Sequence, residues 1–393
     1  MKLGEIIDST NTKMKVLHVI TGLSQGGAEI ALFRLVTHQN TKVKSVVISM
    51  TNLGVYGPLL KKSGIEVHIL GMPRGKITIF GLIKLWKLIK NLRPDVVQTW
   101  MYHSDLIGGI ISRLVGIKAI AWGLHNFNLN SDGASFSTRV TAKLCAALSG
   151  IIPASIISCS ERAVSAHINV GYKENKFTVI PLGYNLSIYN ENQFKRNQIR
   201  EKWGFSQENI VLGCVARWDP QKDHRNLLSA IELLRVQYPL VKLVLAGPRI
   251  DKNNDELVTL IKHTNLDEEY IVLEGPVGDV PSVMTAFDIH ILSSMGEAFP
   301  NVVAEAMACC TPCVVTDVGD AAAIVGNTGW VAPPKNHVLL AEVIEKAIQE
   351  VRQTEKWQLR RRASRDRIVR NYSMCRMVES YEKEWRIICS NTI

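Results

Sequence analysis

The 393-residue chain predicts an α/β protein built from two doubly wound parallel-sheet domains. Its length is about two or three times that of a typical single domain. Hydrophobic residues make up 46% of the chain and charged residues 21%, a balance that supports full cores and excludes a mainly disordered protein. Short β-branched runs alternate with helical patterns, as in parallel sheets with helices on both faces.

The predicted strands form two sets, and helices follow from about residue 336 to the end. Strands of the first set are expected at Lys15–Ile20, Lys44–Ile48, Glu66–Leu70, Asp95–Gln98, Lys118–Trp122 and Ser155–Cys159. Strands of the second set are expected at Ile210–Val215, Lys242–Ala246, Tyr270–Leu273, Ile289–Leu292 and Cys313–Thr316. Sheets of this kind bind ligands beyond the carboxyl ends of their strands, so we expect a cleft between the two domains.

The domain boundary is predicted where Pro, Gly and Asn punctuate the segment after the first set of strands. The N-terminal domain is expected to span residues 1–188 and the C-terminal domain residues 189–374. The last helix, about residues 375–393, is expected to pack back on the N-terminal domain.

Positive charge is concentrated in the first half of the chain. The whole chain carries +10, whereas residues 1–184 hold 21 basic and 9 acidic residues, a net of +12. This asymmetry indicates either an anionic partner, such as a membrane surface, or simple solubility. The scattered aromatic residues give no stacking platform, so nucleic acid is not expected. The polar first 13 residues and eight scattered cysteines predict a cytoplasmic protein without disulfides.

The segment Thr78–Leu92 predicts an amphipathic helix. Leucine, isoleucine and Trp86 fall on one side, and three lysines, Lys84, Lys87 and Lys90, fall on the other. One interpretation is a helix that covers the sheet and exposes a solvated basic face. The other is that the basic face meets anionic lipid, where each cation contributes about 1 kcal/mol.

Residues 293–308 follow a predicted strand and open a predicted helix, with Pro300 at the first helical position. The N–H groups of Phe299, Asn301 and Val302, together with the helix dipole, would form a phosphate site. Glu305, about a turn further on, can accept hydrogen bonds from ribose hydroxyls. Glu297 lies on the loop before the helix. The alternative is an ordinary solvated pair of glutamates.

Two cations, Arg217 and Lys222, come just after a strand of the second set. Fixed cations there can hold a diphosphate and stabilise it as it leaves, in place of a divalent metal. The chain shows no Asp-x-Asp pair typical of a metal site, so neither a metal nor another cofactor is expected. The alternative is a pair of surface cations on a polar loop.

Glycine and histidine mark the strand ends of the first set. The glycine pair Gly26-Gly27 removes side chains so that a substrate can approach the backbone. His125 follows a strand that ends near Trp122, where it can contact a sugar hydroxyl or assist proton movement. His103 is a second candidate, for shaping an acceptor pocket. A packed histidine remains the alternative for each.

Six segments resemble, in order and placement, those of the retaining family-4 glycosyltransferases, which have the GT-B fold. They are Gly26-Gly-Ala-Glu29, Trp122-Gly-Leu-His-Asn126, Cys214-Val-Ala-Arg-Trp-Asp-Pro-Gln-Lys222, Leu245-Ala-Gly-Pro248, the Glu297-x7-Glu305 region, and Thr316-Asp-Val-Gly319 with Gly329-Trp-Val-Ala-Pro333. Each segment alone is weak, whereas their order and strand-to-loop placement together are specific. The resemblance covers nearly the whole chain.

The resemblance implies transfer of a sugar, with retention, from a nucleotide-sugar to a glycan or a polyprenyl-diphosphate-linked acceptor. Here the nucleotide-sugar is a substrate and no metal is required. It implies that Arg217 and Lys222 hold the diphosphate, and that His125 contacts the donor sugar. The Gly26-Gly27 loop would lie on the acceptor side. Assembly of bacterial surface polysaccharide, such as O-antigen or capsule, at the inner face of the cytoplasmic membrane is the expected setting.

The chain departs from the family pattern at two positions. Asp223 stands where many members have glycine, and Asp320-Ala-Ala-Ala323 lacks a glutamate common after Thr-Asp-Val-Gly. No residue stands out as a covalent nucleophile. This favours a mechanism in which the acceptor attacks the face of the sugar from which the diphosphate leaves, over a double displacement. Two other functions remain open: a sugar-nucleotide epimerase of the same fold, and a non-catalytic, membrane-docked partner of another transferase.

Overall fold

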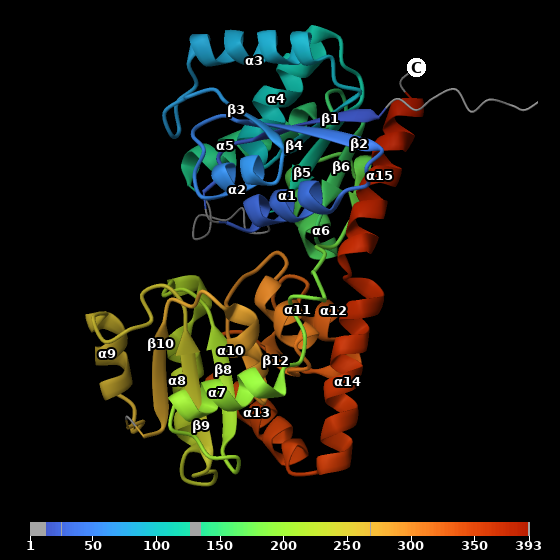
Figure 1. The fold of residues 1–393 in the computed structure, drawn as a ribbon. Helices are drawn as coiled ribbons and strands as arrows, with labels where there is room; N and C mark the ends of the chain where they lie inside the picture. The colour runs from blue at the N-terminus through green and yellow to red at the C-terminus, as the bar shows by residue number, and fades with distance from the viewer. Residues whose placement is uncertain (1–12, 25, 126–134, 268, 392–393) are drawn as a thin grey trace, which may run out of the picture. The chain divides into compact units, whose positions relative to one another are not determined.

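The computed structural model describes residues 13–24, 26–125, 135–267 and 269–391. It divides into two compact units (Figure 1). Unit 1 comprises Met1–Pro181 together with Met377–Ile393, and unit 2 comprises Leu182–Arg376. The boundary between the units therefore falls between Pro181 and Leu182, a few residues before the expected one, in the segment that Pro, Gly and Asn punctuate.

Unit 1 is built on a seven-stranded parallel sheet with the order β3-β2-β1-β4-β5-β6-β7. Its strands are β1 (Met14–Ile20), β2 (Val43–Ser49), β3 (Glu66–Ile69), β4 (Val96–Trp100), β5 (Ile120–Leu124), β6 (Ser155–Ser158) and β7 (Phe177–Val179). The chain runs outward in one direction through β2 and β3 and in the other through β5 to β7. The switch between β1 and β4 is where doubly wound sheets bind ligands.

Helices cover both faces of this sheet. They are α1 (Gly27–His38), α2 (Tyr56–Lys62), α3 (Ile79–Leu92), α4 (Tyr102–Val115), α5 (Phe136–Leu148), α6 (Glu161–Val170), the short η1 (Glu174–Lys176) and α15 (Met374–Ser390). Right-handed crossovers place α1 and α2 on one face and α4 and α5 on the other, with α3 packed beside α4 (Figure 1). From α15, the Trp385 indole N–H donates to Gln98 Oε1 at 3.1 Å, which ties the last helix to the centre of the sheet.

Unit 2 is built on a six-stranded parallel sheet with the order β10-β9-β8-β11-β12-β13. Its strands are β8 (Ile210–Val215), β9 (Val241–Ala246), β10 (Ile271–Gly275), β11 (Ile289–Leu292), β12 (Cys313–Thr316) and β13 (Trp330–Ala332). Its helices are α7 (Gln193–Lys202), η2 (Pro220–Lys222), α8 (His224–Leu234), α9 (Asp255–Lys262), α10 (Val280–Ala286), α11 (Asn301–Ala308), α12 (Ala321–Val325), η3 (Gly326–Thr328), α13 (His337–Val351) and α14 (Thr354–Asn371). The α/β prediction of two parallel-sheet domains is thus confirmed.

Local sequence explains where several helices begin and end. Thr78 and Ser160 cap α3 and α6 by accepting hydrogen bonds from the backbone N–H groups of Gly81 and Ala163. Gly171 ends α6 in the left-handed conformation, with φ of 105°, which costs glycine little. Polar side chains at starts and glycine at ends therefore set these boundaries.

A buried ion-pair cluster fastens α7 to the sheet of unit 2. The Asp288 carboxylate accepts hydrogen bonds from Arg196 at 2.5 Å, from Arg200 at 2.6 Å and from the Val211 N–H at 2.7 Å. Burial alone would raise the pKa of Asp288, but the two arginines and the backbone N–H outweigh it and lower that pKa. Asp288 is therefore held ionised inside unit 2.

The structure differs from the sequence expectations in three details. The three-residue strands β7 and β13 were not predicted, because three residues are too few to show a strand pattern. Pro300 is the N-cap of α11 and not its first residue. Trp86 is 37% exposed and does not lie on the core face of α3, whereas Leu85 and Ile89 do. Within the described ranges, no helix has the length and apolarity needed to span a bilayer.

Candidate active site

In unit 2 the predicted residues Lys222 and Glu297 form an ion pair. Lys222 ends η2, after β8, and Glu297 lies on the loop between β11 and α11. The Lys222 Nζ lies 2.5 Å from Glu297 Oε1, and the Ser294 hydroxyl donates to the same oxygen at 2.8 Å. The side chains of Lys222 and Glu297 are 15% and 14% exposed, so this pair is largely removed from water.

The loop that carries Glu297 is fixed from two sides. On one side, the Met295 N–H donates to the Gln221 carbonyl at 2.8 Å, and the Ser293 hydroxyl donates to the Lys222 carbonyl at 2.8 Å. On the other side, the Asp320 N–H donates to the Ala298 carbonyl at 3.0 Å. These bonds join the ends of three strands, so the loop has little freedom to move alone.

Arg217 lies at the more exposed edge of the same group. Its side chain is 57% exposed, and its Nε and Nη2 each lie 3.0 Å from Asp219 Oδ2. Burial raises the pKa of Asp219, but the Gln221 backbone N–H and the charges of Arg217 and Lys222 outweigh it and lower the pKa below its usual value. Both predicted cations therefore act on one carboxylate.

The first turn of α11 lies next to this group in the chain. No side chain caps α11, and the Tyr184 hydroxyl donates to Asn301 Oδ1 at 2.8 Å. The Phe299 ring is buried, 5.7 Å from the Tyr372 ring centroid, and Val302 is half-buried. Glu305 is only 7% exposed. Neither Glu297 nor Glu305 is therefore a solvated surface side chain.

Backbone geometry explains the first departure from the family pattern. Asp223 has φ of 49° and ψ of 52°, the left-handed conformation that glycine adopts most easily. Aspartate tolerates this conformation better than most residues, and here its carboxylate caps α8 by accepting from the Asn226 N–H. Asp223 thus replaces glycine without changing the turn after Lys222.

In unit 1 a cavity of about 880 Å³ brings together the four predicted residues Gly26, Gly27, His103 and His125. It opens at the carboxyl ends of β1, β4 and β5, on both sides of the strand-order switch. A Cβ at Gly27 would meet no atom within 4 Å, so its absent side chain leaves open space. Neither glycine has a positive φ, and Gly26 is extended with φ of −169°. The conformational freedom of glycine is therefore not needed at either position.

His125 forms one wall of this cavity. Its ring stacks on Trp100, with centroids 5.1 Å apart and planes at 18°. Burial lowers the pKa of His125 to about 4, so the ring is neutral at neutral pH. Among the described residues its Nε2 has no hydrogen-bond partner. The neighbouring Asn126 lies outside those residues. His125 is therefore a neutral ring that stacking holds in place.

Two further residues, Met101 and Glu29, line this cavity, and the sequence assigned neither of them a role. Met101 has φ of 71° and ψ of 156°, a region that is almost exclusive to glycine, and its N–H donates to the Gly123 carbonyl at 2.9 Å. Glu29, on the first turn of α1, lines the cavity, and burial raises its pKa. Met101 could not be predicted, because backbone strain cannot be read from residue type. Glu29 lies in the Gly26-Gly-Ala-Glu29 segment, but nothing in that segment indicated its role.

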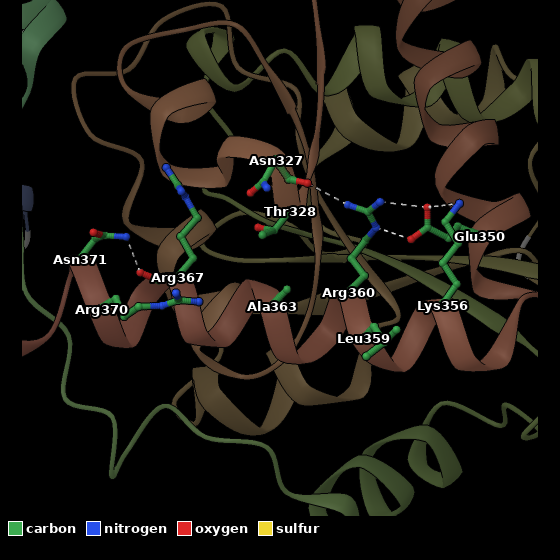
Figure 2. Close-up of a pocket in the computed structure, with 10 residues that line it drawn as sticks. All are labelled: Asn327, Thr328, Glu350, Lys356, Leu359, Arg360, Ala363, Arg367, Arg370 and Asn371. Carbon is green, nitrogen blue, oxygen red and sulfur yellow. Dashed lines mark hydrogen bonds and ion pairs between the residues drawn. The ribbon is translucent and has the colours of Figure 1, made fainter.

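A separate cavity in unit 2, about 560 Å³, lies along α14 (Figure 2). Its arginines already have partners. Arg360 pairs with Glu350 through two nitrogens, and Arg367 donates to the carbonyls of Ala323 and Ile324. These bonds hold α14 against its neighbours, so the basic lining is explained by packing. Over the described ranges, no three His, Cys, Asp or Glu side chains gather as metal ligands.

Two doubly wound parallel-sheet units, each with polar groups at the carboxyl ends of its strands, define a two-domain protein of the α/β class. Residues 25–188 match the family model "Glycosyltransferase Family 4", and residues 195–364 match "Glycosyl transferases group 1". The chain therefore belongs to glycosyltransferase family 4, with the GT-B fold, and it is a glycosyltransferase. This confirms the resemblance drawn from the sequence segments.

Similar proteins span most of the chain. A UDP-Gal:α-D-GlcNAc-diphosphoundecaprenol α-1,3-galactosyltransferase from Escherichia coli is 25% identical over 81% of this chain and 83% of its own length. An N,N'-diacetylbacillosaminyl-diphospho-undecaprenol α-1,3-N-acetylgalactosaminyltransferase from Campylobacter jejuni is 26% identical over 84% and 89%. The crystal structure of Anabaena HepE in complex with UDP superposes with a TM-score of 0.82 at 21% identity, covering 94% of this chain and 99% of that one.

Proposed function

We propose that this glycosyltransferase moves a sugar from a UDP-linked donor to a polyprenyl-diphosphate-linked acceptor, in the assembly of a bacterial surface polysaccharide. The names of the two bacterial relatives support this choice of acceptor, and the UDP complex of HepE supports the nucleotide. The net charge of +12 over residues 1–184 fits an acceptor presented at an anionic membrane surface.

The Lys222–Glu297 ion pair is the observation that carries the proposal. Arg217, Lys222, Asp219 and Glu297 together carry no net charge, so a diphosphate would compete with the two carboxylates for the two cations. When the donor binds, Lys222 would exchange Glu297 for a diphosphate oxygen. Ser294 would keep Glu297 in place, with a carboxylate oxygen available to a hydroxyl of the donor sugar.

Positive charge and backbone N–H groups would then surround the leaving diphosphate. Arg217, Lys222 and the uncapped start of α11 at Phe299, Asn301 and Val302 would stabilise its growing charge. The anomeric C–O bond to the diphosphate breaks, and the acceptor hydroxyl forms the new C–O bond on the same face. Its proton passes to the departing phosphate oxygen. In this proposal Glu305 holds the ribose, and two fixed cations take the place of a divalent metal.

The unit 1 cavity would receive the acceptor. The Gly26-Gly27 backbone and His103 line its wall, with the open space at Gly27 available to the ligand. His125 is neutral, so it would orient a sugar hydroxyl through a hydrogen bond and not through charge. Trp100 would prevent the imidazole from turning away.

A transfer assay with labelled UDP-sugars and a short-chain polyprenyl-diphosphate sugar tests the proposal. The expected result is acceptor-dependent transfer with an α-linkage that is unchanged by EDTA. Conversion of the donor to an epimer without acceptor would instead indicate the epimerase. Binding of UDP without turnover across a panel of acceptors would indicate the non-catalytic partner. Loss of transfer in EDTA, with recovery on adding Mg²⁺ or Mn²⁺, would contradict the metal-free mechanism.

A further inference from the structure

The helix α3 has a second face whose apolar side chains remain exposed in the described part of unit 1. Its inner face is formed by Gly81, Leu85 and Ile89, which are buried. Its outer residues include Ile79, Phe80, Ile83 and Trp86, which are 65%, 82%, 45% and 37% exposed. Large apolar side chains so exposed on one helix indicate an interaction surface.

Cations are interleaved with these apolar side chains. Phe80, Ile83, Lys87 and Lys90 follow one another at spacings of three, four and three residues, so they share one face of the helix. The Lys90 Nζ lies 4.7 Å from the centroid of the Trp86 ring. From residue 67 to residue 94 the chain has six basic residues and no acidic residue. We call Ile79, Phe80, Ile83, Trp86, Lys87 and Lys90 the outer face of α3.

We infer that the outer face of α3 docks unit 1 on an anionic lipid bilayer, with its apolar side chains inserted at the headgroup boundary. An interfacial helix combines apolar side chains with lysines in this way, and lysine stems can keep their ammonium groups at the phosphate level. This inference rests on the proposed function, because it names the surface through which a lipid-linked acceptor would be reached.

Charge argues against a second copy of the chain as the occupant. Self-association through this face would bring the lysines of one copy against those of the other, with no acidic residue in the segment to compensate. A bilayer that contains phosphatidylglycerol supplies the missing negative charge. It also supplies an apolar interior for Phe80 and Ile83, which an anionic polymer would lack.

Co-sedimentation of the full chain with lipid vesicles tests the inference. Wild type is expected to bind phosphatidylcholine vesicles that contain phosphatidylglycerol, and to bind pure phosphatidylcholine vesicles much more weakly. Exchange of Lys87 and Lys90 for glutamine should weaken binding by about 25-fold, about fivefold for each lysine. The variant Phe80→Ser should weaken binding at least about tenfold, at high salt as well as low.

Matched controls lie elsewhere on the surface. Lys61 and Lys62 are exposed on α2, on the other face of the unit 1 sheet, and their exchange for glutamine should leave binding unchanged. Phe194, 74% exposed on α7 of unit 2, matches Phe80 in type, and Phe194→Ser should also bind like wild type. Equal losses in test and control variants would overturn the inference. A wild-type dimer that Phe80→Ser converts to monomer would also overturn it, in favour of self-association.

A second measurement separates this inference from the proposed function. Transfer to a short-chain acceptor free in solution should be unchanged in Phe80→Ser and in the Lys87/Lys90 variant, because α3 lines no part of the unit 1 cavity within the described residues. Wild type that transfers sugar but binds no vesicle would contradict the docking surface alone. Wild type that binds vesicles as described but transfers nothing would contradict the function alone.

Discussion

The variant Gly319→Ala is expected to disturb the candidate donor site by moving the loop that carries Glu297. Gly319 follows β12 with φ of 49°, in the left-handed region. A Cβ built at this position would lie 2.3 Å from the Glu297 carbonyl oxygen and 2.4 Å from that of Ala298. Real Cβ atoms almost never approach closer than 3.0 Å, so the Glu297 carbonyl would have to move away by at least about 0.7 Å and the Ala298 carbonyl by at least about 0.6 Å.

Two costs add in this variant. The left-handed backbone costs alanine about 1–2 kcal/mol relative to glycine, and the overpacked contact costs typically 1–3 kcal/mol more. Since a displacement of about 1 Å can reduce catalysis about 100-fold, kcat/KM for the donor should fall by about 10- to 100-fold. Denaturant unfolding followed by intrinsic fluorescence measures the loss of stability, and steady-state transfer kinetics measure the fall in kcat/KM.

The variant Gly204→Ala is the matched control. Gly204 also has positive φ, 73°, but a Cβ there would meet no atom within 4 Å. It should therefore lose only about 1–2 kcal/mol of stability and keep wild-type kinetics. Equal behaviour of Gly319→Ala and Gly204→Ala in both measurements would show that Gly319 does not provide the space that the Glu297 loop needs.

Three further variants test other parts of the structure. Met101→Gly should raise the free energy of unfolding of unit 1 by about 1–3 kcal/mol, because it relieves a backbone conformation that only glycine adopts easily; an unchanged or lowered value would contradict the strain. His290→Leu should make the free energy of unfolding of unit 2 fall less steeply as the pH drops. Burial lowers the pKa of His290 to about 3, so between pH 6.5 and 3 only the unfolded chain takes up its proton, and stability falls by about 1.4 kcal/mol per pH unit as the pH drops. Denaturant melts at pH 7 and pH 5 should show about 2 kcal/mol less loss in this variant, and equal losses would refute the assignment. Asp288→Asn should destabilise unit 2 by about 3–5 kcal/mol, because it leaves Arg196 and Arg200 buried without their counter-charge; a loss under 1 kcal/mol in the same melts would show that the cluster is not needed.

The fold could be predicted from sequence because its signals are local and repeated. Each long strand is a β-branched run, and each unit alternates such runs with helical periods. The strands β7 and β13 escaped prediction because three residues carry no periodicity. The outer face of α3 escaped for a different reason. Both faces of this helix are apolar, so periodicity alone could not tell which of Leu85 and Trp86 faces the core.

The residues of the candidate site could be predicted from sequence, but not which of them bind each other. Strand ends placed Lys222 and Glu297 in two loops, and the parallel sheet brings these loops together at the carboxyl ends of the neighbouring strands β8 and β11. No sequence rule indicated that the two side chains would bind each other, because they are 75 residues apart in the chain. The strain at Met101 was equally hidden, since tertiary contacts and not residue type impose it.

Calorimetric titration of UDP into wild type, Lys222→Met and Glu297→Gln tests whether Lys222 exchanges Glu297 for the diphosphate. We expect the two variants to shift the affinity for UDP in opposite directions. Lys222→Met should bind UDP about 10- to 100-fold more weakly, because it loses a charged hydrogen bond. Glu297→Gln should bind UDP about tenfold more tightly, because the competing carboxylate is gone, while its transfer rate falls. Equal affinities in all three proteins, or weaker binding by Glu297→Gln, would show that Lys222 does not exchange Glu297 for the diphosphate.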